Sequence, residues 1–344
     1  MRKYFLFVIG LILGSCSENK FDKLFSEQIK EDGPGVSVLI IKNDSVLFSK
    51  SYGSADLKTK DLITSKTLFN LGSISKTFVM NSILMLRDEG KLTLEDSLIK
   101  YFPEFKNKDI ARKVKIKHLL THTSGLPDIR PVSEQPEFYL TADDAQNWAP
   151  VMQADSLKFE PGSQYEYSNP AFNALALIIE KVTGDNWRHF VAERIFKPAG
   201  MTSSTITDGA HPESGVSHGY VFENETWNEL DYGEEPTFCA AGNGGVWSSV
   251  EELLKYQEAL ANATFMKESS IKESMEEKSF GIGWSWFVGK TSKGFKTVGH
   301  TGTQGGFYCD YVTVPEKKIV YIMLANFPID RDILNTKVLN LLEL

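Results

Sequence analysis

Residues 69–90 read FNLGSISKTFVMNSILMLRDEG, and this stretch decides how the rest of the chain is interpreted. Between positions 73 and 89 the residues at 78–80 and 83–86 are all apolar, so no face of a helix here would be polar throughout. A helix that is apolar on all sides is buried, and Gly90 marks its end. The sequence therefore predicts a buried helix over residues 73–89 at the centre of the core.

Strand patterns lie toward both ends of the chain, outside this helix. Residues 36–41 and 46–52 flank Asn43-Asp44, a hairpin signal, and further strands are expected over 280–288, 295–300, 307–314 and 319–325. Sequential strands joined by short turns pair antiparallel, so both ends of the chain should share one sheet.

Helix and loop signals dominate about residues 91–240, with helices expected at 170–182 and 187–196. Ser248-x-x-Glu251 predicts a capped helix start, and a closing helix is expected over 333–344. We therefore predict an α+β fold, in which an antiparallel β-sheet is flanked by helices and carries an inserted helical subdomain.

The composition is that of a globular protein large enough for a sizeable core. The 344 residues are 42% hydrophobic and 24% charged, with a formal net charge of −8. The one basic run, residues 112–117, is interpreted as a solvated face. Wrapping nucleic acid requires clustered cations, so nucleic acid is excluded as a partner.

The first residues have the character of an export signal. Arg2 and Lys3 precede an apolar stretch, 4–13, that is about half as long as a membrane span. Leu13-Gly14-Ser15-Cys16 resembles the lipobox of bacterial lipoproteins, in which the cysteine is lipidated; an ordinary signal peptide with an incidental cysteine is the alternative. We expect a signal peptide over 1–15, a lipidated tether and an N-terminal helix within 16–33, with 17–20 as the tether, and one large domain over 34–344. The protein would then be exported and lipid-anchored on the periplasmic or cell-surface side of a bacterial membrane.

Cysteine and histidine spacing predicts no metal and no other cofactor. Cys239 and Cys309 remain once Cys16 carries lipid, and whether they form a disulfide stays open because sequence does not reveal their distance. His118 and His122 have the i, i+4 spacing of zinc ligands, but position 119 is Leu and no third ligand is evident. We interpret both histidines as structural.

Ser73-Ile74-Ser75-Lys76 is an S-x-x-K motif in an unusual setting. Four such motifs occur, at 17–20, 73–76, 97–100 and 269–272, and only the second opens a buried helix. Spacing i, i+3 places Ser73 and Lys76 on one helix face, and a desolvated lysine can act as a base for a serine nucleophile. At a helix start the serine N–H is also free to bind an oxyanion. The alternative is Ser73 as an N-cap beside a solvated Lys76.

Two further motifs are each weak evidence for a functional site when taken alone. Tyr167-Ser168-Asn169 precedes an expected helix, and its first and third residues point the same way in an extended segment. The alternative is Asn169 as N-cap and Tyr167 as core. His300-Thr301-Gly302-Thr303 ends a predicted strand, where small residues let a substrate approach the backbone, or forms a glycine-rich hairpin with an incidental histidine.

The order Ser-x-x-Lys, Tyr-x-Asn, His-Thr-Gly is far more specific than any one motif. With it the chain resembles the serine β-lactamase and penicillin-binding protein superfamily. The resemblance is greatest to the branch of class C β-lactamases, D-Ala-D-Ala carboxypeptidases, D-aminopeptidases and esterases. The supporting stretches are FNLGSISKT (69–77), HLLTHTSGL (118–126), PGSQYEYSN (161–169), GNGGVWS (242–248) and GHTGTQGGF (299–307).

The resemblance implies a β-lactamase/transpeptidase-like fold and a role for each motif residue. Ser73 would be the acylated nucleophile and Lys76 its proton partner. Tyr167 would be the base that also protonates the leaving group, and Asn169 would orient Lys76 and the substrate amide.

The third motif would bind the substrate along a strand. His300, Thr301 and Gly302 would line it, with His300 where class C β-lactamases have Lys. The backbone N–H groups of Ser73 and Thr303 would form the oxyanion hole, typically worth about 3 kcal/mol per donor.

We therefore expect a serine hydrolase that forms an acyl-enzyme with an amide or ester. Its substrate would be a small molecule or peptide, cell-wall peptides included, and the histidine favours a carboxypeptidase-like or esterase-like activity. The alternatives are a class C-type β-lactamase and a non-catalytic sensor that binds cell-wall peptides or penicillin. A carboxypeptidase should offer a cation to the terminal carboxylate, and no residue of the sequence can be matched to that role.

Overall fold

The main sheet joins the two ends of the chain. The computed structural model describes residues 15–30, 32–135, 138–209, 211–230 and 238–344. Six antiparallel strands run in the order β10-β11-β12-β13-β1-β2. They are β1 (Val36–Lys42), β2 (Ser45–Tyr52), β10 (Phe287–Lys290), β11 (Lys296–Gln304), β12 (Phe307–Val314) and β13 (Ile319–Ala325). Because β1 pairs with β13, the predicted sharing of one sheet by both chain ends is confirmed.

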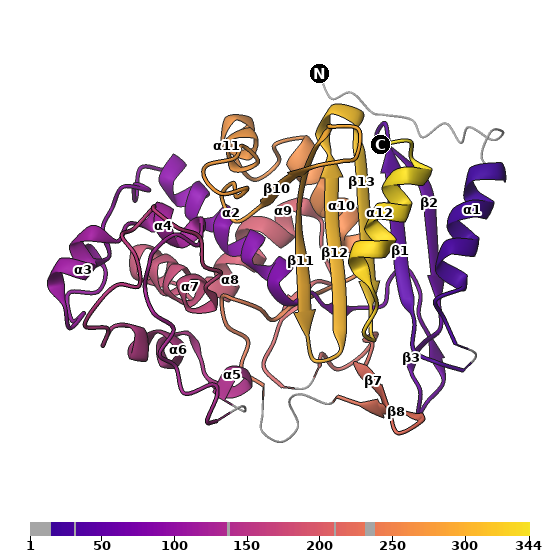
Figure 1. Cartoon of the computed structure of the whole chain (residues 1–344), viewed down its shortest axis with the longest axis horizontal. Helices are drawn as coiled ribbons and strands as arrows, with labels where there is room; N and C mark the ends of the chain where they lie inside the picture. The colour runs from indigo at the N-terminus through magenta and orange to yellow at the C-terminus, as the bar shows by residue number, and fades with distance from the viewer. Residues whose placement is uncertain (1–14, 31, 136–137, 210, 231–237) are drawn as a thin grey trace.

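Both faces of this sheet are covered (Figure 1). Along β1, Val38 and Ile40 point to one face and pack with α1 (Ser15–Ser26) and α12 (Arg331–Leu341). Leu39 and Ile41 point to the other face and join the core around α2 (Ser75–Asp88) and α10 (Val250–Ala261). The alternation follows from the two-residue period of a strand, and the α+β class is confirmed.

Most remaining helices form a separate body on the far side of α2 from the sheet (Figure 1). They are α3 (Lys108–Lys113), α4 (Ile116–Leu120), α5 (Phe138–Thr141), α6 (Asp144–Val151), α7 (Asn169–Thr183) and α8 (Trp187–Val191). The π-helical turn η3 (Ala192–Phe196) and α9 (Lys197–Ala199) follow α8, and α9 packs against α10. The helix expected over 170–182 is α7, and its C-cap is Gly184, whose left-handed φ of 73° suits a glycine.

Among the described residues, the remaining strands are short and form three small sheets. The small sheets are β5-β9-β6, made of β5 (Phe69–Asn70), β9 (Val246–Ser248) and β6 (Thr205–Ile206); β3 (Ser54–Asp56) with β4 (Asp61–Leu62); and β7 (Tyr220–Glu223) with β8 (Thr226–Glu229). In the described part of the chain no helix is both long and apolar enough to cross a bilayer.

The predicted central helix is buried, but it begins later than expected. Every residue of α2 from Ser75 to Leu86 is buried. Residues Gly72–Ile74 form a 3₁₀ turn, η1, instead of the first helical turn. Ser73 therefore lies in the turn that leads into the helix, and Lys76 lies in the first turn of the helix itself.

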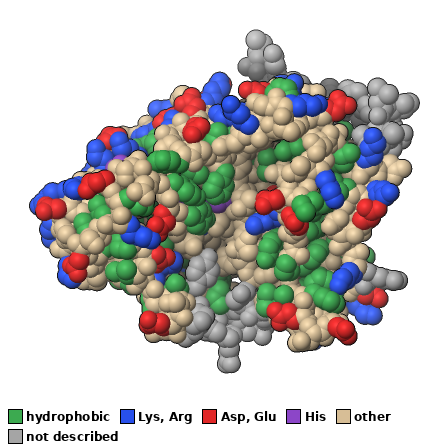
Figure 2. All heavy atoms as spheres, in the orientation of Figure 1, with side chains coloured by type: hydrophobic (Ala, Val, Ile, Leu, Met, Phe, Trp, Pro, Cys, Tyr) green, Lys and Arg blue, Asp and Glu red, His purple; other side chains and the backbone are tan. Residues whose placement is uncertain are grey.

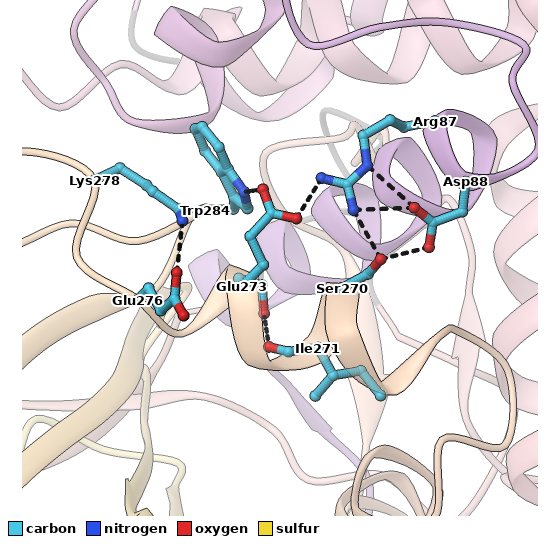
Figure 3. Close-up of polar contacts among 9 residues, drawn as sticks. Arg87, Asp88, Ser270, Ile271, Glu273, Glu276, Lys278 and Trp284 are labelled. Atoms are coloured by element: carbon cyan, nitrogen blue, oxygen red, sulfur yellow. Dashed lines mark hydrogen bonds and ion pairs between the residues drawn. The ribbon is translucent and has the colours of Figure 1, made fainter.

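A polar cluster holds the far end of α2 (Figure 3). Arg87 donates to Glu273 at 2.7 Å, to Ser270 at 2.7 Å and to Asp88 at 3.0 Å. Glu273, on α11 (Glu268–Ser274), also accepts from Trp284 Nε1 at 3.0 Å. The cluster ties the helix that carries Lys76 to the segment that leads into β10.

Three other predicted boundaries, besides the start of α2, also differ from the structure. Residues 280–286 are not a strand, because positive φ angles at Phe280 and Ser285 break the extended run. Ser248 ends β9, so Ser249 caps α10 and accepts from Glu252 N. Residues 17–20, expected as a tether, belong to α1, whose Phe21 and Phe25 dock on the sheet.

Candidate active site

Ser73 and Lys76 form the centre of the site. Lys76 Nζ is 2.9 Å from Ser73 Oγ, and it donates a second hydrogen bond to the main-chain oxygen of Asn243 at 2.6 Å. Ser73 is half-buried, whereas Lys76 is 0% exposed. The predicted pairing of serine and lysine on one face is present, and the alternative of a solvated Lys76 is wrong.

The surroundings of Lys76 favour its neutral form. Burial lowers the pKa of the Lys76 ammonium far below its usual value, and the positive charge of Arg130 lowers it further. Its nearest partners are a hydroxyl and a carbonyl, and the rings of Tyr167 and Phe172 lie 5.2 and 5.7 Å from Nζ. A neutral amine keeps a lone pair, so it can accept the proton of Ser73.

Tyr167 lies beside Lys76 and packs against two other rings. The ring of His122 stacks on it with a centroid distance of 4.4 Å and an interplanar angle of 26°. Phe287, at the start of β10, is 6.5 Å away at 17°. Tyr167 is 36% exposed, so the phenol combines a constrained ring with access to solvent.

Asn169 is the first residue of α7, and its neighbour Ser168 is the N-cap, which accepts from Ala171 N. The Oδ1 atom of Asn169 is buried and has no hydrogen-bond partner among the described residues. A buried acceptor without a partner is costly, and a substrate amide N–H would satisfy it. The lysine contact that we expected of Asn169 is made instead by the carbonyl of Asn243.

Close backbone contact brings the third motif to the nucleophile. His300, Thr301, Gly302 and Thr303 lie within β11, which continues to Gln304 and does not end at the motif. A Cβ on Gly302 would lie 1.9 Å from the Leu71 carbonyl oxygen, and one on Gly72 would lie 2.7 Å from Thr303 N. Only glycine fits these positions, which place the Ser73 and Thr303 backbones side by side.

The side chain of His300 is buried beneath β11 and carries no charge at neutral pH. The side chain is 1% exposed, and its Nδ1 is 2.7 Å from the Thr301 carbonyl oxygen. Burial, together with the charges of Lys76 and Arg331, lowers the pKa of His300 to about 3. Nε2 is buried without a partner among the described residues.

A buried chain of hydrogen bonds, which sequence reasoning missed, supports Asn243. Asp144 Oδ1 accepts from Gly242 N and from Asn173 Nδ2, both at 2.8 Å. Asn173 Nδ2 also donates to Asn243 Oδ1 at 3.0 Å. Burial raises the pKa of Asp144 to about 7. The only sequence signal was the stretch GNGGVWS, which holds residues 242 and 243.

In Figure 2 the surface of the molecule is hollowed between the helical body and the sheet, and hydrophobic side chains gather on the helical side of this hollow. Within the described ranges no cluster of three or more His, Cys, Asp or Glu side chains is arranged to bind a metal ion. His118 and His122 each use Nδ1 to accept a backbone N–H, from Lys115 and Ser168 respectively.

The cysteines are not joined. Cys239 and Cys309 are free thiols, and Cys309 is buried in β12. Cys16 lies in the first turn of α1, and most of the predicted signal peptide, residues 1–14, lies outside the described residues.

Comparison with known proteins agrees with this geometry. The profile of the Beta-lactamase family matches residues 21–342. Penicillin-binding protein 4* of Bacillus subtilis (strain 168) is 27% identical over 313 residues, which cover 84% of this chain and 67% of the relative.

Solved structures show the same fold. The octameric penicillin-binding protein homologue from Pyrococcus abyssi matches with a TM-score of 0.79 at 25% identity, over 95% of this chain and 76% of the other. A D-stereospecific amidohydrolase from Streptomyces sp. matches in fold with a TM-score of 0.74 at 23% identity, over 90% and 94%. The chain belongs to the Beta-lactamase family, and thereby to the superfamily of serine β-lactamases and penicillin-binding proteins.

Proposed function

We propose that the protein is a serine hydrolase that forms an acyl-enzyme on Ser73. The observation that carries this proposal is the buried Lys76, whose Nζ lies 2.9 Å from Ser73 Oγ and whose pKa is strongly lowered. A structural lysine would be expected to pair with a carboxylate. This one contacts a hydroxyl and a carbonyl, as a proton acceptor for a nucleophile would.

The reaction follows from the placement of these groups. Ser73 Oγ attacks the substrate carbonyl carbon, and its proton passes to Lys76. The developing oxyanion faces the N–H groups of Ser73 and Thr303. The C–N or C–O bond then breaks, the leaving group takes a proton from the Lys76–Tyr167 pair, and water hydrolyses the serine ester.

We place the substrate among esters and amides that lack a free carboxylate beside the reacting carbonyl. The two arginines whose charges act on Lys76 and His300 already have partners. Arg130 forms an ion pair with Asp128 at 2.7 Å, and Arg331 donates to the Gly302 carbonyl at 2.7 Å. His300 is neutral, so it offers no cation at the position where class C β-lactamases have Lys. An esterase-like or amidase-like activity is favoured over a carboxypeptidase-like one, in line with the D-stereospecific amidohydrolase that shares the fold.

Intact-mass spectrometry after exposure to a fluorophosphonate, a penicillin and a panel of short acyl esters tests this function. We expect one probe equivalent per chain, lost in Ser73→Ala and retained in Ser269→Ala, which removes an exposed serine of another S-x-x-K motif. Absence of probe label and of ester hydrolysis in folded protein would refute the proposal. A lasting penicillin adduct without ester turnover would indicate the sensor, and rapid penicillin hydrolysis the class C-type β-lactamase.

We further propose that Cys16 carries a lipid that anchors the protein to a bacterial membrane, with the hydrolase domain in the periplasm or at the cell surface. The order of charged, apolar and small residues before Cys16 supports this. Cys16→Ser should abolish incorporation of a fatty-acid analogue, with Cys239→Ser as the control. Undiminished label in Cys16→Ser would contradict the anchor.

A further inference from the structure

His122 contacts three consecutive residues around Tyr167. Its main-chain oxygen accepts from Glu166 N at 2.9 Å, and its Nδ1 accepts from Ser168 N at 3.0 Å. Its ring stacks on the ring of Tyr167, the residue between Glu166 and Ser168, with centroids 4.4 Å apart. One residue thus holds the backbone on both sides of Tyr167 and the aromatic side chain itself.

The backbone of His122 adopts a conformation that is uncommon for a residue with a side chain. Its φ is +54°, in the left-handed region. Such a conformation persists where surrounding contacts enforce it, and it is most frequent at functional sites. Here it turns the ring inward, where the side chain is 1% exposed, while the carbonyl remains available to Glu166.

The hydrogen bond from Ser168 fixes the protonation of the ring. Because Nδ1 accepts, the neutral imidazole carries its proton on Nε2. Burial lowers the pKa of His122 far below its usual value. A neutral ring adds no positive charge beside Lys76, so stacking on Tyr167 does not oppose proton transfer.

We propose that His122 is a positioning residue for Tyr167: it fixes the orientation of the phenol through the stack and the two flanking hydrogen bonds, and it exchanges no proton with substrate. The proposal rests on the proposed function of Tyr167 in proton transfer. A core-filling role, by contrast, would make His122 matter for stability alone.

Two variants separate the contacts. His122→Asn keeps a side-chain acceptor for Ser168 N–H and tolerates positive φ, but it loses the stacked ring. His122→Phe keeps the ring and loses the acceptor. His118→Asn is the matched control, because His118 lies in the same segment and also accepts a backbone N–H through Nδ1, at 3.1 Å. If one variant at position 122 fails to fold, the other still decides.

The first measurement is a double-mutant cycle on ester hydrolysis. Displacement of a reacting group by about 1 Å can cost 10²-fold in rate, so we expect each variant at position 122 to lower kcat/KM at least about tenfold, largely in kcat, with His118→Asn unchanged. In a Tyr167→Phe background the same substitutions should cost nothing further. Wild-type rates, or losses that multiply fully in that background, would overturn the proposal.

The second measurement does not depend on activity. In protein labelled with ¹³Cζ-tyrosine, the Tyr167 resonance is assigned by its loss in Tyr167→Phe. We expect this resonance and its titration to shift in both variants at position 122 and to stay in place in His118→Asn. If the wild type hydrolyses no ester, the proposed function fails, whereas an unmoved Tyr167 resonance contradicts the positioning role itself.

Discussion

Gly302→Ala should disable the site while leaving the fold in place. A Cβ at position 302 would lie 1.9 Å from the Leu71 carbonyl oxygen and 3.4 Å from Ser73 N. The first distance is about 1 Å short of the 3.0 Å below which Cβ atoms essentially never approach other heavy atoms. The clashing atom belongs to the backbone, so β11 and the turn that carries Ser73 must separate by about that amount.

The cost should fall mainly on catalysis. Loss of one oxyanion donor typically lowers the rate by about 10²–10³-fold, and overpacking costs about 1–3 kcal/mol of stability. We therefore expect fluorophosphonate labelling of Ser73 and ester kcat/KM to fall about 10²-fold or more, with a cooperative melt at reduced temperature. Pairing of β11 with β12 along its length should keep the strand in the sheet.

Gly289→Ala is the control for this substitution. It also adds a methyl to a glycine in a strand next to β11, but its nearest neighbour is the Thr297 Oγ1 at 3.0 Å, a side-chain atom that can rotate away. It should retain wild-type labelling. Labelling by Gly302→Ala within threefold of wild type would refute the reasoning that this glycine sets the contact between strand and nucleophile.

Three further outcomes are expected. Losses from Lys76→Ala and Tyr167→Phe should be strongly non-additive in ester kcat/KM, since both serve one proton relay; independent multiplication of the two losses would contradict the relay. Asn169→Ala should lower kcat/KM for an amide about tenfold more than for the matched ester, which has no N–H to offer Oδ1; equal losses would show that Oδ1 does not meet the substrate. The pKa of Asp144 is about 7 in the fold and near 3.8 in the unfolded chain, so the stabilising effect of its protonation is complete below pH 4 and lost as pH rises through 7. Urea unfolding gives the free energy of unfolding of Asp144→Asn and of wild type at each pH. The variant should gain about 2–4 kcal/mol in this free energy relative to wild type between pH 4 and pH 8, and a pH-independent difference would argue against this pKa.

The fold was predictable where the pattern along the chain was uninterrupted. Residues 307–314 and 319–325 are strands β12 and β13 with the predicted bounds, because apolar runs there end at turn residues. Residues 280–286, FGIGWSW, place large apolar side chains at alternate positions, which is the pattern of a strand. Left-handed positions at Phe280, Gly281 and Ser285 break the extended run, and only the glycine among them is a residue typical of that conformation.

The site was predictable where chemistry depends on side chains at fixed spacing. The approach of Ser73 to Lys76 follows from helical geometry and residue type. The Asn243 carbonyl could not be found in that way, because every residue has one and the two partners are separated by 167 positions. Asp144 resembled any acidic residue at a helix start, where its burial against Gly242 is invisible.

Three of the buried polar atoms that lack a partner in the described structure lie where the reaction is proposed. Folded proteins pair nearly all buried polar groups, so an unpaired one calls for a reason. Asn169 Oδ1, His300 Nε2 and His122 Nε2 are all buried and unpaired among the described residues. Asn169 belongs to the motif of Tyr167, the ring of His122 contacts Tyr167, and His300 opens the third motif. Buried polar atoms without a partner also occur elsewhere among the described residues, such as Trp148 Nε1 and Ser217 Oγ. Around Lys76 the fold leaves buried hydrogen-bonding atoms without partners in the described part of the protein. A site needs such atoms if a bound ester or amide is to form hydrogen bonds with it.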